Sequence, residues 1–318
     1  MLKIFRSTPI ALLSNPLDNI GQVSMTNRLL TFGAMLSVTA LLTMPANGMM
    51  RSYSASMQES SWSLVKNSPT ACVLEHQIPR FGKVNFSSVA NKNINLDFAM
   101  NMLQKPAKYT EVELRSMPPK WRSNSPSSHI ANLAYYKQFD GEVLDDQAWL
   151  MLNELEKGMS PTFFYRDWYN SNDSVAVGVS AVNFADQHMA FMDCVSKLLP
   201  YSFEDISFTT LNYKKNTQIL DRRSQEKLKM IRDYLKFEPE MELVLVDSYT
   251  DSYGGRYKNS QISKQRANDI KRMLEDSGIA GNKIVVTGHG EKRHIASNES
   301  IQGRNENRRV VITMNRGY

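Results

Sequence analysis

The sequence of 318 residues contains only two cysteines, and its basic residues never gather into a solid run. The 38 Lys and Arg against 32 Asp and Glu give a net charge of +6, which without such a run does not indicate a nucleic-acid-binding protein. The Gly-x-Ser-x-Gly elbow, the His-Glu-x-x-His zinc motif and a Gly-rich phosphate loop with Lys are all missing. His289 and His294 flank a turn with no third ligand at a fixed spacing. The sequence therefore predicts a protein that is not an enzyme and needs neither metal nor cofactor.

No long apolar run is present either, and the N-terminus carries only a short one. Arg28 is followed by apolar residues 29–44 and then by Pro45-Ala46-Asn47-Gly48, a stretch that is short for a membrane span and ends in small residues. This pattern is typical of a secretory signal peptide and predicts cleavage after Gly48; the alternative is an uncleaved membrane anchor. Because residues 1–24 fit poorly in front of it, we expect translation to start at Met25. The mature protein is expected in the periplasm.

The two cysteines, Cys72 and Cys194, lie far from this apolar stretch. Neither is placed to carry the lipid of a lipoprotein. In an oxidising compartment two cysteines with no third partner most simply form one disulfide. The alternative is a pair of buried free thiols.

Residues 49–200 predict a β-rich domain, because short apolar segments alternate with turn residues. The expected strands are Cys72–Leu74, Gly82–Phe86, Ile94–Met100, Thr162–Tyr165 and Val175–Val182. Helices are expected at Asp145–Glu156 and Phe184–Leu199, where apolar residues recur at helical spacing. Pro118-Pro119 and the Ser-rich run that follows predict a long surface loop.

Residues 201–318 change to an alternation of strands and helices. The expected order is strand Ile206–Leu211, helix Asp221–Phe237, strand Leu243–Val246, helix Ser263–Asp276, and strands Lys283–Thr287 and Arg309–Thr313. A β-α-β-α-β-β order predicts one sheet covered by helices. The whole chain is thus expected to be α+β, with a β-rich domain followed by this sandwich.

A set of motifs follows these C-terminal strands in a fixed order. They are Thr250-Asp251-Ser252-Tyr253-Gly254, Asn259, Ser263-Lys264-Gln265-Arg266-Ala267, Gly288-His289-Gly290-Glu291 and Asn307-Arg308-Arg309-Val310. Over Phe203–Met314 the sequence resembles the OmpA/MotB family of peptidoglycan-binding domains. The combination of motifs is far more specific than any one of them.

The residue types in these motifs suit a zwitterionic ligand. A carboxylate such as Asp251 binds an ammonium group, and a planar guanidinium such as Arg266 binds a carboxylate. Arg266 is expected in the first turn of a helix that Ser263 caps, where backbone amides add donors. The resemblance implies that Asp251 and Arg266 are the main ligands of diaminopimelate, with Thr250 and Asn259 in support and Arg309 at the rim. The alternative is an Asp–Arg salt bridge without a ligand.

The N-terminal segments carry a second resemblance. They are Pro79–Gly82, Ser87–Phe98, Ser116–Arg122, Lys137–Gly141 and Tyr201–Ile206. Together with a signal peptide and two cysteines, they resemble the MotY family of T-ring proteins in sodium-driven polar flagellar motors. The resemblance implies that the N-terminal domain docks on the flagellar basal body and on MotX, that the C-terminal domain binds peptidoglycan, and that sodium-type stator complexes are held in place. One alternative is a general envelope tether without a motor role; a wall hydrolase is another, but no catalytic residues can be named for it.

Overall fold

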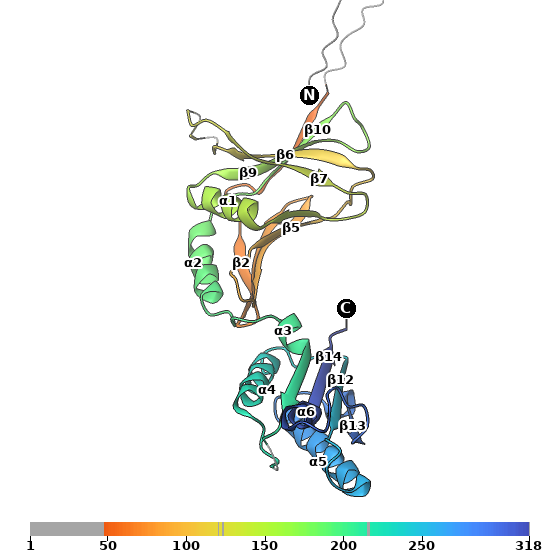
Figure 1. Cartoon of the computed structure of the whole chain (residues 1–318). Helices are drawn as coiled ribbons and strands as arrows, with labels where there is room; N and C mark the ends of the chain where they lie inside the picture. The colour runs from red at the N-terminus through yellow and green to blue at the C-terminus, as the bar shows by residue number, and fades with distance from the viewer. Residues whose placement is uncertain (1–47, 120, 123, 215–216, 318) are drawn as a thin grey trace, which may run out of the picture. The chain divides into compact units, whose positions relative to one another are not determined.

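The computed structural model describes residues 48–119, 121–122, 124–214 and 217–317 of the chain (Figure 1). The upstream segment and the apolar part of the expected signal peptide lie outside these residues. Within them, no helix is both long and apolar enough to cross a membrane. The buried side chains form two hydrophobic cores, one between Trp62 and Val195 and the other between Tyr201 and Met314. We propose that the domain boundary lies near residue 200, between these two cores.

The N-terminal core lies in a domain of ten strands and two helices. Its elements are β1 (Met50–Tyr53), β2 (Trp62–Ser68), β3 (Ala71–Ile78), β4 (Gly82–Val89), β5 (Asp97–Met102), β6 (Thr110–Met117), β7 (Ser128–Tyr135), β8 (Gly141–Leu144), α1 (Asp145–Glu156), β9 (Ser160–Arg166), β10 (Ser174–Gly178) and α2 (Phe184–Val195). One sheet has the order β1-β10-β9-β6-β7 and the other β2-β3-β4-β5-β8. All neighbours are antiparallel except β1 and β10.

The two sheets pack face to face because every second side chain along their strands is apolar and buried. Val84 and Phe86 of β4 and Phe98 of β5 point inward from one sheet, and Phe163 of β9 points inward from the other. Phe98 and Phe163 stack across the interface with their ring centroids 5.6 Å apart. The β-rich prediction for this domain is therefore confirmed.

The sequence located most of these elements but misplaced several ends. The helix at Asp145–Glu156 and the loop between β6 and β7 are as expected. The expected strand at residues 175–182 ends at Gly178, and Asn183, with a positive φ of 61°, is the N-cap residue of α2. Helix α2 ends at Val195 rather than at residue 199. Apolar residues continue in the sequence after the end of β10 and after the end of α2. The apolar pattern therefore could not show where these two elements end.

The predicted disulfide is present between Cys72 of β3 and Cys194 of α2. Their Cα atoms lie 6.0 Å apart, and both side chains are buried. The bond joins positions 122 residues apart in the sequence. It therefore ties an early strand of this domain to its last helix.

His76 of β3 is an ionisable side chain buried in the N-terminal domain. Its ring stacks on Trp62 at 4.6 Å, and Nδ1 lies 2.8 Å from the carbonyl oxygen of Ser61, while Nε2 is buried with no partner among the described residues. Burial lowers the pKa of His76 below its ordinary value of 6.5. As pH falls through about 6.5, the unfolded chain takes up a proton that the folded domain does not, so stability falls toward acid.

We therefore expect the N-terminal domain to unfold at a lower urea concentration at about pH 5.5 than at about pH 7.5. Replacing this imidazole in His76→Gln should reduce that difference, whereas His129→Gln, at an exposed position, should leave it unchanged. The measurement is urea unfolding of the three proteins at both pH values. An equal pH dependence in all three would show that His76 does not contribute.

The C-terminal core lies under a four-stranded sheet. Its elements are α3 (Phe203–Ser207), β11 (Phe208–Asn212), α4 (Arg222–Leu235), β12 (Leu243–Tyr249), α5 (Arg256–Glu275), the 3-10 turn η1 (Gly281–Lys283), β13 (Ile284–Gly290), α6 (Ile301–Asn307) and β14 (Arg309–Asn315). The strand order is β11-β14-β12-β13, with only β12 and β13 parallel. One side chain in two along β12 and β14 packs into the core that α4 and α5 share.

Three features of this domain differ from the expected β-α-β-α-β-β order. Residues 203–207 form a helix, because Ser202 and Asp205 make a reciprocal capping box there. Helix α6 was not predicted. Helix α5 begins at Arg256 and not at Ser263, so the predicted N-cap role of Ser263 is wrong. No capping side chain marks the true start, since Gly255 occupies the N-cap position.

Candidate functional site

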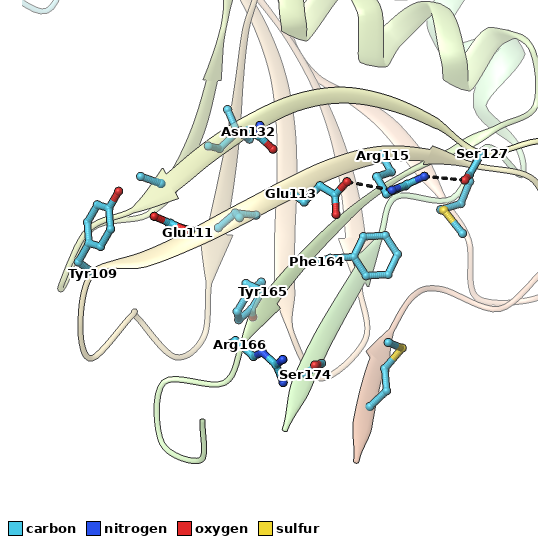
Figure 2. Close-up of a pocket in the computed structure, with 15 residues that line it drawn as sticks. Tyr109, Glu111, Glu113, Arg115, Ser127, Asn132, Phe164, Tyr165, Arg166 and Ser174 are labelled. Carbon is cyan, nitrogen blue, oxygen red and sulfur yellow. Dashed lines mark hydrogen bonds and ion pairs between the residues drawn. The ribbon is translucent and has the colours of Figure 1, made fainter. Parts of the chain in front are cut away.

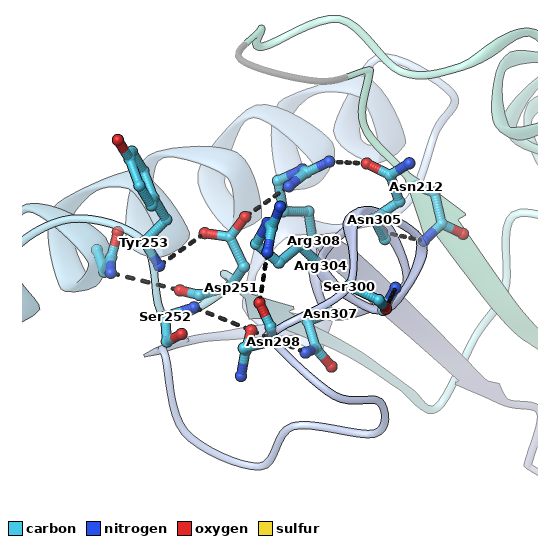
Figure 3. A network of polar contacts seen from close by, with 12 residues as sticks. Asn212, Asp251, Ser252, Tyr253, Asn298, Ser300, Arg304, Asn305, Asn307 and Arg308 are labelled. Carbon is cyan, nitrogen blue, oxygen red and sulfur yellow. Dashed lines mark hydrogen bonds and ion pairs between the residues drawn. The ribbon is translucent and has the colours of Figure 1, made fainter.

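Asp251 lies in the loop after β12, and its side chain is buried inside a polar network (Figure 3). Its Oδ2 atom lies 2.5 Å from Nη1 of Arg308, which comes from the junction of α6 and β14. Its Oδ1 atom accepts a hydrogen bond of 3.2 Å from the backbone amide of Tyr253. The structure thus presents a carboxylate held by a guanidinium at the carboxyl end of a strand.

Arg308 is the residue that sequence reasoning missed. The candidate named there, Arg309, lies over the ring of Tyr249 at 3.9 Å and donates to the carbonyl oxygen of Arg293 at 3.0 Å. It is buried in these contacts, so its expected place at the rim is wrong. The alternation of side chains along a strand could have identified Arg308 as the partner of Asp251. Val310 and every second residue after it face the helices, and Arg308, two residues before Val310, belongs to the same alternating set.

Arg266 lies in the middle of α5 and not in the first turn as expected. It follows Asn259 by seven residues, which is two helical turns, so the two side chains lie on the same face of the helix. Its Nη2 atom donates to the carbonyl oxygen of Thr217 at 3.0 Å, and its guanidinium lies 4.1 Å from the ring centre of Tyr213. Burial lowers the pKa of Arg266, although Tyr213 and Asp251 oppose that shift. No direct bond joins Arg266 to Asp251 among the described residues, and the carboxylate pairs with Arg308 instead. The alternative of an Asp251–Arg266 salt bridge is therefore not what the structure shows.

Burial raises the pKa of Tyr213 to about 12, against the opposing charge of Arg266. The phenol therefore stays neutral beneath the guanidinium. Arg266 keeps its positive charge, because an arginine guanidinium does not lose its proton in proteins. Arg308 pairs with the buried Asp251 carboxylate directly, and the charge of Arg266 lies near it without a bond. These two guanidinium groups and one carboxylate leave a surplus of positive charge.

Thr250 and Asn259 complete the cluster. The Thr250 amide donates to the carbonyl oxygen of Gly290 at 2.8 Å, which fixes the loop to the end of β13. Nδ2 of Asn259 lies 3.0 Å from Oε2 of Glu291 and 3.4 Å from the carbonyl oxygen of Asp251. The structure therefore brings Thr250, Asp251 and Asn259 together as expected, with Arg308 as an additional member.

Several buried polar atoms of this cluster have no partner among the described residues. They are Oγ1 of Thr250, Nε of Arg266 and Nε of Arg308. An unpaired buried donor costs free energy of about 1–3 kcal/mol. Donors of this kind, beside a surplus positive charge, suit a carboxylate ligand.

Gly288 explains why β13 can approach the helix that carries Asn259 and Arg266. A Cβ atom at Gly288 would lie 2.5 Å from the backbone nitrogen of Lys264 and 2.8 Å from its Cα. The next glycine, Gly290, has a φ of 60° and accepts no side chain without strain. Its amide donates to Oγ of Ser263 at 2.9 Å, which is the role that this serine has in place of a cap.

A second layer of polar side chains supports the loop of Asp251 (Figure 3). Oδ1 of Asn298 accepts from the Ser252 amide at 3.2 Å, and Nδ2 of Asn307 donates to the same Asn298 oxygen at 3.0 Å. Nη1 of Arg304 donates to the Asn298 carbonyl oxygen at 2.6 Å. Helix α6 thereby positions Arg308 at its C-terminal end and, through Asn298, the loop residue Ser252 that follows Asp251.

Comparison with known proteins identifies the family. The sequence pattern of the MotY N-terminal domain matches residues 53–200, and that of the OmpA family matches residues 212–308. The sodium-type flagellar protein MotY of Vibrio parahaemolyticus is 41% identical over 292 residues, which are 92% of this chain and 99% of that protein. The chain belongs to the MotY family.

Two other relatives match a shorter part of this MotY-family chain. The peptidoglycan-binding protein ArfA of Mycobacterium tuberculosis is 39% identical over 90 residues, covering 28% of this chain and 27% of ArfA. The probable lipoprotein YiaD of Escherichia coli is 41% identical over 71 residues, covering 22% of this chain and 32% of YiaD. Each of these two matches covers less than a third of this chain and of the relative.

A wide hollow lies in the MotY N-terminal domain and not at Asp251. It is an open groove of about 1060 Å³ on the outer face of the β1-β10-β9-β6-β7 sheet (Figure 2). Glu113 and Arg115 of β6 form an ion pair of 2.9 Å there, and Arg115 also donates to Oγ of Ser127 at 3.0 Å. Phe164 and Arg166 of β9 extend the same face. Its charged groups stand on the solvated side of a sheet.

The two histidines that flank a turn in the MotY C-terminal domain have separate contacts. Nε2 of His289 lies 2.7 Å from Oδ1 of Asp247, and its ring stacks on Tyr249 at 4.6 Å. Nδ1 of His294 lies 2.8 Å from Nδ2 of Asn298. Among the described residues, no group of three or more His, Cys, Asp and Glu side chains is placed to hold a metal ion.

Proposed function

We propose that this protein is a periplasmic structural component of a sodium-driven flagellar motor that binds peptidoglycan through the Asp251 site. A sodium-type flagellar protein is its relative over nearly the whole chain, and its C-terminal domain matches the OmpA family. The observation that carries the proposal is the buried Asp251 carboxylate paired with Arg308, with donors of Arg266, Arg308 and Thr250 that have no partner among the described residues.

The free end of diaminopimelate in a peptidoglycan stem peptide suits this cluster. Its ammonium group would bind the Asp251 carboxylate, and its carboxylate would bind Arg308 and Arg266, which have unpaired Nε atoms. The Thr250 hydroxyl would donate to the same head group, and Asn259 would bind a neighbouring peptide group. Both charges of the ligand are then compensated, which a site with one charged residue could not do.

The role we propose is mechanical. The N-terminal domain docks on the flagellar basal body and on MotX as part of the T ring, and the C-terminal domain holds the wall. Sodium-type stator complexes are thereby kept at the rotor, and the wall supplies the reaction to their torque. This assignment is supported by the family membership, since fold alone does not define function.

Wall binding tests the site. We expect Asp251→Asn to lower the amount of purified protein that sediments with isolated peptidoglycan by at least about tenfold, because a charge-assisted contact is lost. Asp247→Asn is the matched control, since Asp247 lies on β12, just before the loop of Asp251, but contacts His289. Circular dichroism should show that both variants are folded. Sedimentation of Asp251→Asn at the wild-type level would refute the site.

Thermal unfolding of the wild type gives a second test that no variant can confound. A stem tripeptide with meso-diaminopimelate should raise the Tm of the C-terminal domain, and the same tripeptide with lysine should raise it less, because lysine lacks the second carboxylate. No shift with either peptide would contradict diaminopimelate recognition.

Swimming tests the motor role. Deletion of the gene should stop swimming while filaments remain, and complementation with Asp251→Asn should restore motility only weakly. A general envelope tether would instead give a blebbing, detergent-sensitive cell that still swims. Normal swimming of the deletion strain would remove the motor assignment and leave the wall site to be judged by binding.

A further inference from the structure

A small pocket in the N-terminal domain lies between residues of its two sheets. Residues of β1, β9 and β10 line it, together with the turn between β3 and β4 and the residues after β5. Its volume is about 190 Å³. Sites for small-molecule ligands usually enclose about 300–1,000 Å³. This pocket therefore suits one side chain of a protein partner better than a free small molecule.

Aromatic rings form much of the wall of this pocket, which we call the Trp168 pocket. They belong to Tyr53, Phe81, Tyr165, Trp168 and Tyr169. Tyr165 and Trp168 stack with their centroids 5.0 Å apart, and Tyr169 meets Trp168 edge-on at 6.4 Å. Phe81 packs on Tyr53 at 5.5 Å. Burial, and after it the nearby Tyr53, raises the pKa of Tyr165, so the two groups of rings adjoin.

Two arginines and one aspartate line the Trp168 pocket, so its charges do not balance. Asp167 is buried and pairs with Arg51. Its Oδ1 atom also accepts the backbone amides of Tyr169 and Asn170, at 2.6 and 3.1 Å. Arg80 is exposed, and no carboxylate pairs with it among the described residues. The pocket thus has one guanidinium that can bind a carboxylate from outside the chain.

Arg80 lies in the turn between β3 and β4 with a positive φ of 64°. Glycine adopts such a conformation without strain, whereas arginine does not. Hydrogen bonds from Ser56 lower the pKa of Glu59, and the charge of Arg80 adds a smaller effect at that exposed carboxylate. Residues held in strained conformations gather at binding sites. An arginine at a position that favours glycine thus points to a role for its guanidinium in binding.

We propose that the Trp168 pocket binds an aromatic side chain of a partner protein, and that Arg80 binds the carboxylate of an acidic residue next to it. Tyrosine, tryptophan and arginine supply much of the binding energy at protein interfaces, where pockets receive anchoring side chains. Ring-on-ring contacts favour a flat aromatic side chain, and the guanidinium favours an acidic neighbour. The inference goes beyond the proposed function and does not depend on the Asp251 site, so either can fail without the other.

Two capped dipeptides test the pocket on the full chain. Acetyl-phenylalanyl-aspartate amide carries both groups, and acetyl-phenylalanyl-asparagine amide replaces the carboxylate by a neutral group of the same size. In NMR, the first should shift the indole signal of Trp168, identified by its loss in Trp168→Phe, at an about fivefold lower concentration than the second, because an ion pair is added. Acetyl-alanyl-aspartate amide should leave this signal unchanged, because it lacks the ring.

Arg80→Gly separates binding from folding, because glycine accepts the φ of this position. The variant should unfold at the same urea concentration as the wild type or a higher one, and it should bind the two phenylalanyl dipeptides equally. Arg122→Ala, which removes another exposed arginine of the same domain, should keep the preference for the acidic dipeptide. Equal binding of both dipeptides by the wild type, a preference retained in Arg80→Gly, or no shift of the Trp168 signal with either dipeptide would overturn the proposal.

Discussion

Removal of the Cys72–Cys194 disulfide is expected to lower the free energy of unfolding of the N-terminal domain by about 2–5 kcal/mol. The bond closes a loop between positions 122 residues apart and so restricts the unfolded chain strongly. In the folded domain it joins β3 to α2, whose contacts are otherwise those of packing. Without it, α2 is held only by its buried apolar face.

Urea unfolding of Cys72→Ala/Cys194→Ala measures this effect, with tryptophan fluorescence as the probe, because all four tryptophans lie within residues 49–200, the N-terminal domain. The transition of the C-terminal domain, followed by circular dichroism, should keep its midpoint. A reducing agent should destabilise the wild type and leave the double variant unchanged. A double variant as stable as the wild type would show that the covalent link is not needed for stability.

Loss of Arg308 is expected to destabilise the C-terminal domain by about 3–5 kcal/mol in Arg308→Ala. Its guanidinium and the Asp251 carboxylate are both largely buried, with 10% and 11% of their side chains exposed. Removing one partner leaves the other charge buried without compensation, which costs more than the pair contributes. Wall binding should fall as well, because Arg308 is a proposed contact of the ligand carboxylate.

Two further variants make this prediction specific. Asp251→Asn/Arg308→Met removes both charges and should recover much of the lost stability without recovering wall binding. Arg256→Ala breaks an ion pair with Glu291 in which the arginine side chain is 92% exposed, and it should change stability little. Thermal unfolding and peptidoglycan sedimentation report the two effects separately. Equal destabilisation by Arg308→Ala and Arg256→Ala would argue against a buried pair.

The sequence predicted the fold class, the disulfide and most of the elements, because these follow from patterns that repeat along several residues. Helix Asp145–Glu156 and strand β14 are examples, since their apolar spacing is regular. The start of α5 could not be found in this way, because its first turns are polar and carry no capping side chain. Helix α6 is short and is held by Asn307 contacts to distant loops, which no local pattern reveals.

The same distinction applies to the site. Asp251, Thr250 and Asn259 meet as the motif spacing suggested, because they lie on one loop and the helix that follows it. Arg308 and Arg309 are adjacent, and the direction in which each side chain of β14 points decides which of them reaches Asp251. Arg266 is bound by Thr217 and Tyr213, which come from segments far away in the sequence. Long-range contacts of this kind decide which cation neutralises a carboxylate.

The disulfide also has a consequence for a chain under tension. A pull that enters through residues 195–200 reaches Cys194 and passes through the covalent bridge to Cys72. The segment between the two cysteines, with β4 to β10 and α1, lies in a closed loop that this path bypasses. When the chain is pulled between residues 195–200 and its segment before Cys72, only the residues before Cys72 and after Cys194 can lengthen until the bond is cut. A chain pulled in this way would thus keep most of its N-terminal domain folded while the force acts.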